Sequence, residues 1–402
     1  MDVIDIFRLL AEIPSPSKHE EAVADKIIEL LTSFGAAAQK DAAGNVVCRI
    51  PATDTAKKPL MLTGHMDVVG DDTPVNIRIS DDGRFFETDK KRTLGADDKA
   101  GVSCALALAQ KLCASPDLRH GGLELAFTRD EECDMTGARA LDMGAFLSEY
   151  VLVLDAEKVG ELQIAGAGFT KMTLSVTRTK GGHSGIDIAD SSRVNAVKVL
   201  GEAINAIPQG VYKTDDTGVV ASINIGAVAG GGLKNMPSET RGAGFCAFLA
   251  GNAATNVINT DAFAVYSIRS SDRAVEAALR REIEGIVASL NEKYASKAAA
   301  NVVFEEKVPP FEASVDPTIV DAFKKAAAAC GIAAKVSSFH AAAETHLYAG
   351  RKNARGVAFK PYLTGAANIF NMHSADEMVE IRSIRDGARL IEETFLTFNG
   401  LR

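Results

Sequence analysis

Five segments of this chain place histidine or carboxylate side chains directly after apolar runs. Imidazole nitrogens and carboxylate oxygens are ligands that zinc accepts in proteins. The central segment is residues 94–101, in which Asp97 and Asp98 lie between glycines just before a long apolar helix pattern. The other four segments contribute the remaining candidates: His65 with Asp67, residues 130–132, Asp155 and His373. Together the five segments supply a complete set of metal ligands.

Each segment alone also has an ordinary structural interpretation. Aspartates at a helix start usually cap backbone N–H groups and complement the helix dipole. A single His-x-Asp pair is more often a polar loop contact, and residues 130–132 fit an acidic first helical turn equally well. The two single residues would alone indicate a strand-end cap and a loop histidine: Asp155 and His373. Only the combination favours a metal centre.

The candidate ligands divide evenly between two ions. His65, Asp155 and a shared Asp97 would hold one ion, whereas Glu132, His373 and the same Asp97 would hold the other. Each ion then has one imidazole and two carboxylate ligands, with positions left open for water and substrate.

Two spacings in the set suggest further roles. His65 and Asp67 are two residues apart, so in an extended backbone both side chains point to the same side, and the carboxylate can hold the imidazole. Glu131 and Glu132 are adjacent, which permits a division of labour. One can bind the metal while the other takes a proton from water.

The first part of the chain has the patterns of elements that could position these residues. Short apolar runs with strand-like bounds alternate with helical periodicity. The expected strands are residues 45–50, 59–63, 123–127 and 150–154, with a hairpin at 77–88 and a helix at 102–113. This alternation predicts an α/β fold with a mixed, mostly parallel sheet flanked by helices. In such sheets ligands bind beyond the carboxyl ends of the strands, where the candidate ligands fall.

The pattern changes from about residue 171. Strand patterns occur at residues 171–177, 219–228, 240–249, 262–269 and 301–305, and helical patterns at 192–206 and 274–290. This order indicates an α+β unit large enough to be its own domain. Further helices are expected at 318–330 and 384–398, with a short strand at 366–370. We therefore expect a domain of residues 169–308 inserted into a larger domain formed by 1–168 and 309–402.

Composition excludes several classes of function. The 402 residues include 47% apolar and 24% charged residues, which is typical of a globular protein with two domains. A formal net charge of -9 without a long basic run argues against nucleic acid and membrane surfaces as partners. The sequence lacks a signal-peptide pattern and a long apolar span. Six cysteines without paired spacing indicate reduced thiols and favour the cytoplasm: Cys48, Cys104, Cys113, Cys133, Cys246 and Cys330.

These motifs together resemble the co-catalytic zinc peptidase family that includes peptidase T, aminoacyl-histidine dipeptidase, carnosinase and the aminoacylases. The resemblance covers nearly the whole chain. It rests on His65-Met66-Asp67, GADDKAG at 95–101, Asp130-Glu131-Glu132 followed by Gly137-Ala138, Asp155 and His373. The chain is most similar to peptidase T-like members, although Lys-Gly-Gly-His-Ser-Gly at 180–185 looks more like aminoacyl-histidine dipeptidase.

The resemblance implies a zinc exopeptidase-like catalytic domain that binds two divalent ions. Zinc is the first expectation, with manganese and cobalt as alternatives. In the family's arrangement Asp97 bridges the ions and is joined to Asp98 by a cis peptide bond. Asp98 itself keeps the interpretation of a helix cap. Glu131 becomes the general base and Glu132 a metal ligand, and Asp67 orients His65.

The inserted domain would be the lid of this family. His183, in its glycine-rich loop, would donate a hydrogen bond to the oxyanion, either from this chain or from a partner subunit. Asn235 and Arg269 resemble lid positions that hold the backbone or carboxylate of the substrate. Arginine suits a carboxylate because its planar group can bind both oxygens. A homodimer formed through the lid is a further expectation.

One segment departs from the peptidase T pattern. Residues 339–344 stand where peptidase T relatives often have a glycine-rich loop containing aspartate, and they resemble instead the His-x-x-x-Glu stretch of aminoacyl-histidine dipeptidase. His340 and Glu344 are expected to line the specificity pocket, on one face if the stretch is helical. Tripeptide specificity is therefore open.

The expected function is a two-zinc-dependent exopeptidase that hydrolyses di- or tripeptides by metal-activated water, with Glu131 as general base. In the family, aspartate at the position of Asp155 accompanies aminopeptidases and dipeptidases, which favours cleavage near a free N-terminus. Two alternatives stay open. One is an amidohydrolase of N-acyl or N-carbamoyl amino acids, and the other is a catalytically silent relative that binds peptides.

Overall fold

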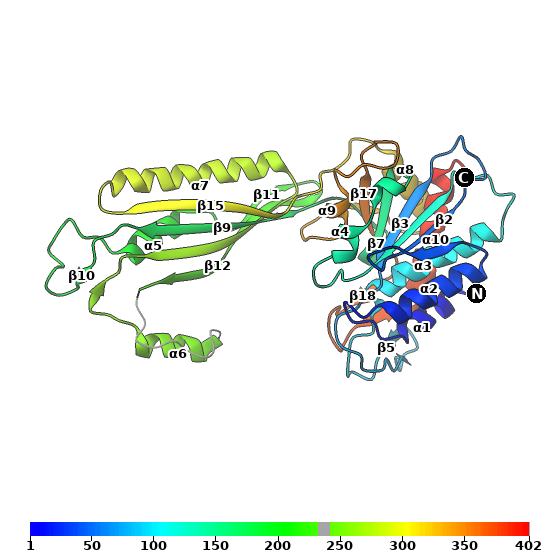
Figure 1. The fold of residues 1–402 in the computed structure, drawn as a ribbon, viewed down its shortest axis with the longest axis horizontal. Helices are drawn as coiled ribbons and strands as arrows, with labels where there is room; N and C mark the ends of the chain where they lie inside the picture. Colours follow the sequence, from blue (N-terminus) through cyan, green and yellow to red (C-terminus); the bar gives the residue numbers. More distant parts are fainter. Residues whose placement is uncertain (232–241, 402) are drawn as a thin grey trace. The chain divides into compact units, whose positions relative to one another are not determined.

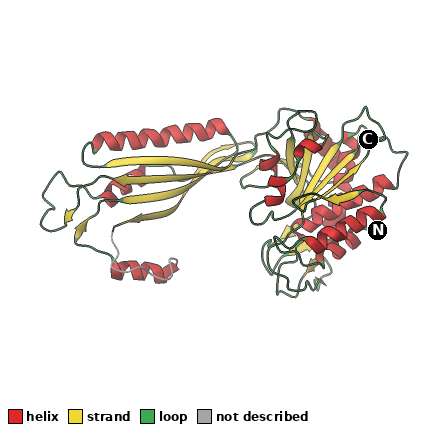
Figure 2. Ribbon diagram, viewed as in Figure 1, coloured by secondary structure: helices red, strands yellow, loops and turns green. Residues whose placement is uncertain are grey.

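A computed structural model describes residues 1–231 and 242–401 of the chain (Figure 1). The chain divides into two compact units. Unit 1 comprises Met1–Gly166 and Phe311–Arg402, and unit 2 comprises Ala167–Pro310. Both units combine helices with strands (Figure 2). The unit boundaries lie two residues from the domain boundaries expected from the sequence.

Unit 1 is built on an eight-stranded sheet with the strand order β1-β2-β6-β3-β7-β17-β8-β16. The strands are β1 (Ala38–Lys40), β2 (Val46–Ile50), β3 (Leu60–His65), β6 (Leu123–Thr128), β7 (Tyr150–Val159), β8 (Glu161–Gly166), β16 (Lys335–Phe339) and β17 (Lys360–Gly365). β3 runs parallel to β6 and β7, β17 runs parallel to β7, and β16 runs parallel to β8. The other three pairs are antiparallel. The predicted mixed, mostly parallel α/β sheet is thus confirmed.

Helices cover both faces of this sheet. One face packs against α1 (Val3–Ala11), α2 (Glu21–Ser33), α3 (Ala96–Cys113), α8 (Thr318–Cys330) and α10 (Ile381–Phe398). The other face packs against α4 (Thr136–Ala140), the short helix Met143–Ala145 and α9 (Thr345–Tyr348). In β3, Leu60 and Leu62 face the first group and Met61 faces the second. Because both faces are buried, the central strands are continuous apolar runs, which is why the sequence predicts them.

A small antiparallel sheet lies beside the main one in unit 1. It contains β18 (Ile369–Phe370), β19 (Met378–Glu380), β5 (Phe85–Glu87) and β4 (Arg78–Ile79), and β4 with β5 is the expected hairpin. β19 pairs with β5, so the loops attached to these two strands are neighbours. One loop leads from β5 to α3, and the other joins β18 to β19 and carries His373.

Unit 2 is an antiparallel sheet with the order β11-β12-β14-β9-β15. Its strands are β9 (Gly168–Thr177), β11 (Gly210–Asp215), β12 (Gly218–Gly230), β14 (Ala262–Ser270) and β15 (Ala299–Val308). Helices α5 (Ala196–Ala206) and α7 (Arg273–Lys293) share a buried apolar cluster with these strands. α7 begins where the Asp272 side chain accepts hydrogen bonds from the N–H groups of Ala274 (2.7 Å) and Val275 (3.0 Å).

Two sequence expectations are wrong in detail. The strand expected at 240–249 is instead the helix α6 (Gly242–Asn252), because a short uniformly apolar run does not distinguish a buried strand from a helix. Of the strand expected at 366–370, only Ile369 and Phe370 are extended, and the sheet strand lies earlier, in β17. The sequence does not predict β17 because it contains Pro361, and proline is depleted in strands away from their ends and edges.

Candidate metal centre

The carboxyl ends of three adjacent strands of unit 1 deliver candidate ligands. His65 is the last residue of β3, residues 130–132 follow β6, and Asp155 lies in β7. Because the three strands are parallel, these positions fall at one edge of the sheet. Asp97 comes from the start of α3, which packs against β3 and β7.

Asp97 stands between two histidines. Its Oδ1 lies 3.2 Å from His65 Nε2, and its Oδ2 lies 3.2 Å from His373 Nε2. Glu132 Oε2 lies 3.0 Å from His373 Nε2, and Asp155 Oδ1 lies 3.5 Å from His65 Nε2. The structure therefore brings the five predicted ligands together in two half-sites that share Asp97.

The donor set fits divalent metal ions. The ligand atoms of His65, Asp97 and Glu132 all lie within 4.8 Å of one another, as do those of His65, Glu131 and Asp155. Within residues 1–231 and 242–401, the ion pairs of this cluster are all with its own histidines and none is with a lysine or arginine. Carboxylates gathered in this way repel one another unless a cation lies between them. Imidazole and carboxylate donors suit zinc, and also manganese or cobalt.

Burial and mutual charge shift the pKa values of the cluster. Burial raises the pKa of Glu131 well above its usual range, and the charge of Asp155 adds to this. Burial also raises the pKa of Glu132 to about 7. The hydrogen bond from His373 to Asp97 raises the pKa of His373 to about 9. Protons and a metal cation therefore compete for the same atoms.

The start of α3 has the backbone that the family resemblance implied. The peptide bond between Asp97 and Asp98 is cis. Asp98 Oδ1 accepts a hydrogen bond from the N–H of Gly101 at 3.1 Å, so Asp98 caps the helix as expected. A Cβ on Gly64 or on Gly101 would lie 2.3 Å from an Asp98 oxygen. Glycine is required at both positions because this carboxylate fills the space.

Asp67 contacts the glutamates more closely than the histidine. His65 Nδ1 lies 2.9 Å from the Asp67 backbone carbonyl oxygen and 3.6 Å from its carboxylate. The carboxylate accepts hydrogen bonds from the N–H groups of Glu131 (2.9 Å) and Glu132 (3.2 Å) and from the Ser17 hydroxyl (2.7 Å). The Asp67 carboxylate therefore keeps the expected ion pair with His65 at 3.6 Å, and it holds the turn after β6 by shorter hydrogen bonds.

The segment expected to line a specificity pocket is irregular. α9 begins at Thr345, so His340 and Glu344 do not share a helical face, and His340 directly follows β16. Glu344 is only 1% exposed. Its Oε1 lies 2.5 Å from Thr128 Oγ1, and the Tyr348 hydroxyl donates to its Oε2 at 2.8 Å. Both oxygens of Glu344 are thus engaged inside unit 1.

The predicted lid residues that the structure describes belong to unit 2. His183 pairs with Val257 across β10 (Gly182–His183) and β13 (Val257–Ile258), and its side chain is exposed. Its Nδ1 accepts hydrogen bonds from the N–H groups of Gly185 (3.1 Å) and Ile186 (3.2 Å). With Nδ1 accepting these bonds, Nε2 is the ring nitrogen that can donate a hydrogen bond to a substrate.

Arg269 in β14 also has features of a ligand-binding group. Its guanidinium lies 5.3 Å from the centre of the Phe169 ring, and its buried Nη1 has no hydrogen-bond partner among the described atoms. Asn235 lies outside the described residues. The substrate contacts of Asn235, Arg269 and His183 stay predictions.

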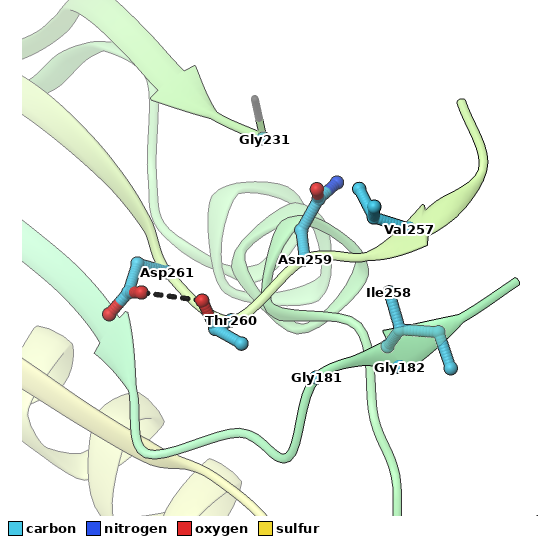
Figure 3. A pocket seen from close by; sticks show the side chains of 8 residues that line it. All are labelled: Gly181, Gly182, Gly231, Val257, Ile258, Asn259, Thr260 and Asp261. Atoms are coloured by element: carbon cyan, nitrogen blue, oxygen red, sulfur yellow. Dashed lines mark hydrogen bonds between the residues drawn. The ribbon is translucent and has the colours of Figure 1, made fainter. Parts of the chain in front are cut away.

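Unit 2 has an open pocket beside the His183 loop. It is lined by Gly181, Gly182, Gly231, Val257, Ile258, Asn259, Thr260 and Asp261 (Figure 3). Thr260 donates a hydrogen bond to Asp261 at 2.7 Å along its wall. The pocket thus belongs to the glycine-rich segment that leads into His183.

Reasoning from motifs misses two buried charged residues beside the centre. Glu377 accepts a hydrogen bond from the N–H of Asp97 at 3.2 Å, and its only sequence signal is its position four residues after His373. Lys99 donates to the carbonyl of Ile13 at 2.6 Å, and burial lowers its pKa to about 7. Glu377 thus holds the backbone of a candidate ligand, and Lys99 holds the backbone between α1 and α2.

The mixed α/β sheet thus carries at one edge a cluster of imidazoles and carboxylates whose donor types suit a metal-dependent hydrolase. The chain belongs to Peptidase family M20/M25/M40, which it matches over residues 61–397. The family resemblance drawn from the motifs is therefore confirmed.

Known proteins resemble the chain to different extents. It is 24% identical over 400 residues to the uncharacterized protein YqjE of Bacillus subtilis (strain 168), covering 97% of this chain and 96% of that protein. It is 32% identical over 212 residues to the cytosol non-specific dipeptidase of Escherichia coli (strain K12), covering 46% of this chain and 43% of that protein. The crystal structure of aminopeptidase PepT from Bacillus cereus ATCC 10987 has the same fold, with a TM-score of 0.80, 21% identity and 98% of each chain covered.

Two further expectations concern the environment of the chain. No helix among the described residues is long and apolar enough to cross a membrane. The six cysteines are free thiols, of which Cys48 and Cys104 are buried. Burial raises the pKa of the Cys48 thiol to about 11, so this thiol is a packing group rather than a nucleophile.

Proposed function

We propose that the chain is a metal-dependent exopeptidase that removes residues from short peptides with a free N-terminus. The observation that carries this proposal is the position of Asp97, whose two carboxylate oxygens face two different imidazoles at 3.2 Å each. One carboxylate between two imidazoles, with a further carboxylate on each, is an arrangement suited to two ions. His65 and Asp155 would hold one ion, and Glu132 and His373 the other.

Two ions held by these residues would supply Lewis acidity and lower the pKa of a water molecule. We assign to Glu131 the role of accepting the proton of that water and passing it to the leaving amine. Its backbone N–H is fixed by the Asp67 carboxylate at 2.9 Å, which directs the adjacent side chains of the turn. Asp67 is therefore a positioning residue, whereas Glu131 is the proposed base.

The proposed lid contributes two groups. His183 can donate from Nε2 to the oxyanion that forms at the substrate carbonyl. Arg269 has a buried nitrogen without a partner among the described residues, which suits a substrate carboxylate. We propose that His183 acts either on the site of its own chain or, in a homodimer, on the site of the partner subunit. We further propose a cytoplasmic enzyme, because the chain is similar to a cytosol dipeptidase and has free thiols.

A substrate panel tests the proposal. The purified chain is stripped with EDTA, reloaded with zinc, manganese or cobalt, and assayed on dipeptides, tripeptides, Xaa-His dipeptides and their N-acetylated or N-carbamoylated counterparts. We expect hydrolysis of free peptides that EDTA abolishes and zinc restores, with little hydrolysis of the blocked versions.

The same panel separates the alternatives. Hydrolysis of N-acyl or N-carbamoyl amino acids without cleavage of free peptides would make the chain an amidohydrolase. A chain that binds two metal ions and peptides but cleaves nothing would be a silent binding relative. Either result would overturn the proposed exopeptidase.

A further inference from the structure

Glu377 is a buried carboxylate that holds the backbone leading to Asp97. It is 1% exposed. Its Oε2 accepts hydrogen bonds from the N–H of Gly95 at 2.8 Å and from the Thr93 hydroxyl. Its Oε1 accepts a hydrogen bond from the N–H of Asp97 at 3.2 Å. Three alternate residues of one segment are therefore tied to a single side chain, and the last of them is the shared candidate ligand.

Glu377 also belongs to the loop that carries His373, the histidine that faces Asp97. This loop joins β18 to β19 and contains His373, whose Nε2 faces Asp97. The loop is closed by local hydrogen bonds, from the Ser374 hydroxyl to the Asn371 carbonyl at 2.7 Å and from the Glu377 N–H to the Ser374 carbonyl at 3.2 Å. A displacement of Glu377 would therefore displace His373 relative to Asp97.

The chemistry of the contacts requires a carboxylate at this position. The three partners of Glu377 are two backbone N–H groups and a hydroxyl, all of which donate. A carboxylate offers acceptors on both oxygens, whereas an amide would turn an NH₂ group toward one of the donors. Because both oxygens accept hydrogen bonds from residues 93–97, we assign Glu377 a positioning role rather than a ligand role.

We propose that Glu377 is a positioning residue of the metal centre, which fixes Asp97 against His373 and so sets the affinity of the half-site that contains His373 and Glu132. This inference rests on the metal centre of the proposed function. The half-site of His65 and Asp155 shares Asp97, but its other two ligands come from the strands β3 and β7, so it depends less on the Glu377 loop.

The test measures metal affinity directly rather than turnover. Metal-free wild-type chain, Glu377→Gln and Asp376→Asn are titrated with zinc in competition with a chromophoric chelator. Asp376 is a matched control, because it is exposed on the same loop and its carboxylate pairs with the exposed Lys90 rather than with residues 93–97. We expect two zinc ions to bind the wild type and Asp376→Asn alike. In Glu377→Gln one zinc should bind about 10- to 100-fold more weakly, while the other, which keeps His65 and Asp155, should lose much less affinity.

A second variant tests the same contact in case Glu377→Gln does not fold. Thr93→Val removes one of the three donors and keeps both N–H groups, so we expect a smaller loss, on the order of threefold, at the zinc that Glu377→Gln weakens most. Unchanged binding of both ions in Glu377→Gln, or equal weakening of both, would overturn the positioning role while leaving the metal centre intact. If Glu377→Gln does not fold, unchanged zinc binding by Thr93→Val overturns it. Failure of the wild type to bind zinc would instead remove the proposed function.

Discussion

The Asp67 carboxylate accepts a hydrogen bond from the backbone N–H of Glu131 at 2.9 Å. Asp67 lies two residues beyond the end of β3, and Glu131 lies three residues beyond the end of β6, so this contact joins the turns that follow two parallel strands. The same carboxylate also accepts from the N–H of Glu132 and from Ser17. A single buried side chain therefore sets the position of both glutamates.

Replacing Asp67 by alanine should lower kcat/KM by about 10- to 100-fold, because the turn that carries Glu131 and Glu132 loses its acceptor. Ser17→Ala removes only one of the three donors to this carboxylate, and its effect should stay below about tenfold. Steady-state kinetics of the zinc-loaded variants measures both. Equal activity of Asp67→Ala and wild type would show that the carboxylate does not position the turn.

Replacing Glu131 by glutamine should lower kcat by at least about 100-fold, since the amide cannot accept the proton from water. The zinc content should stay at the wild-type value, because Glu132 rather than Glu131 is the proposed ligand. Asp134→Asn, an exposed acid on the same loop, is the matched control and should keep normal turnover. Near-normal turnover of Glu131→Gln would contradict the base assignment, and loss of one zinc would make Glu131 a ligand.

Replacing Glu344 by glutamine should be tolerated. An amide can accept from the Tyr348 hydroxyl and donate to Thr128 Oγ1, which lies 3.3 Å from the Gly64 carbonyl oxygen. Burial raises the pKa of Glu344, which also favours a neutral group at this position. We expect the free energy of unfolding to change by less than about 1 kcal/mol in Glu344→Gln and to fall by about 2–3 kcal/mol in Glu344→Ala.

Kinetics of the same variant tests the alternative role of Glu344. A group engaged only inside the protein leaves the KM for dipeptides unchanged when it becomes glutamine. A large rise in KM without a change in stability would instead support the predicted contact between Glu344 and the substrate.

The acid stability of the chain should depend on Lys360. Its ammonium donates to Asp316 at 2.6 Å and to Glu149, at the amino ends of β17 and β7. The hydrogen bond from Lys360 lowers the pKa of Asp316, and it also lowers the pKa of Glu149 against the opposing effect of burial. Carboxylates with a lowered pKa stabilise the fold above their unfolded pKa, near 4, and this contribution disappears as the pH falls through the folded pKa.

Urea unfolding at pH 7 and at pH 4 or below measures this effect. The midpoint of wild type should fall on acidification, and in Lys360→Met the midpoint should be lower at pH 7 and fall less. Lys335→Met is the matched control, since among the described residues Lys335 pairs with Glu161 alone, at the surface, where the pair contributes little. An identical pH dependence in Lys360→Met and wild type would exclude the contribution.

Local patterns in the sequence carry much of the fold. β3, β6 and β7 are predicted because strands buried on both faces must be apolar throughout, a property that neighbouring residues display by themselves. The sequence also predicts that Asp98 caps α3, because capping joins residues three positions apart. By contrast, α6 is predicted as a strand, because a short apolar run fits a helix and a strand equally well. β17 is not predicted, because a proline near the start of a segment argues against a strand.

The candidate site likewise has features that the sequence predicts and features that it does not. The residue types of the ligand set, and the expectation that strand ends bring them together, follow from the sequence and its family resemblance. Only tertiary structure decides that Glu377 holds Asp97, a contact across 280 residues, and that Glu344 is enclosed between Thr128 and Tyr348. It also decides that the Asp67 carboxylate lies closer to the backbone N–H of Glu131 than to the imidazole of His65. Hydrogen bonds between distant segments depend on how strands and loops stack in space, and that information is absent from the spacing of residues along the chain.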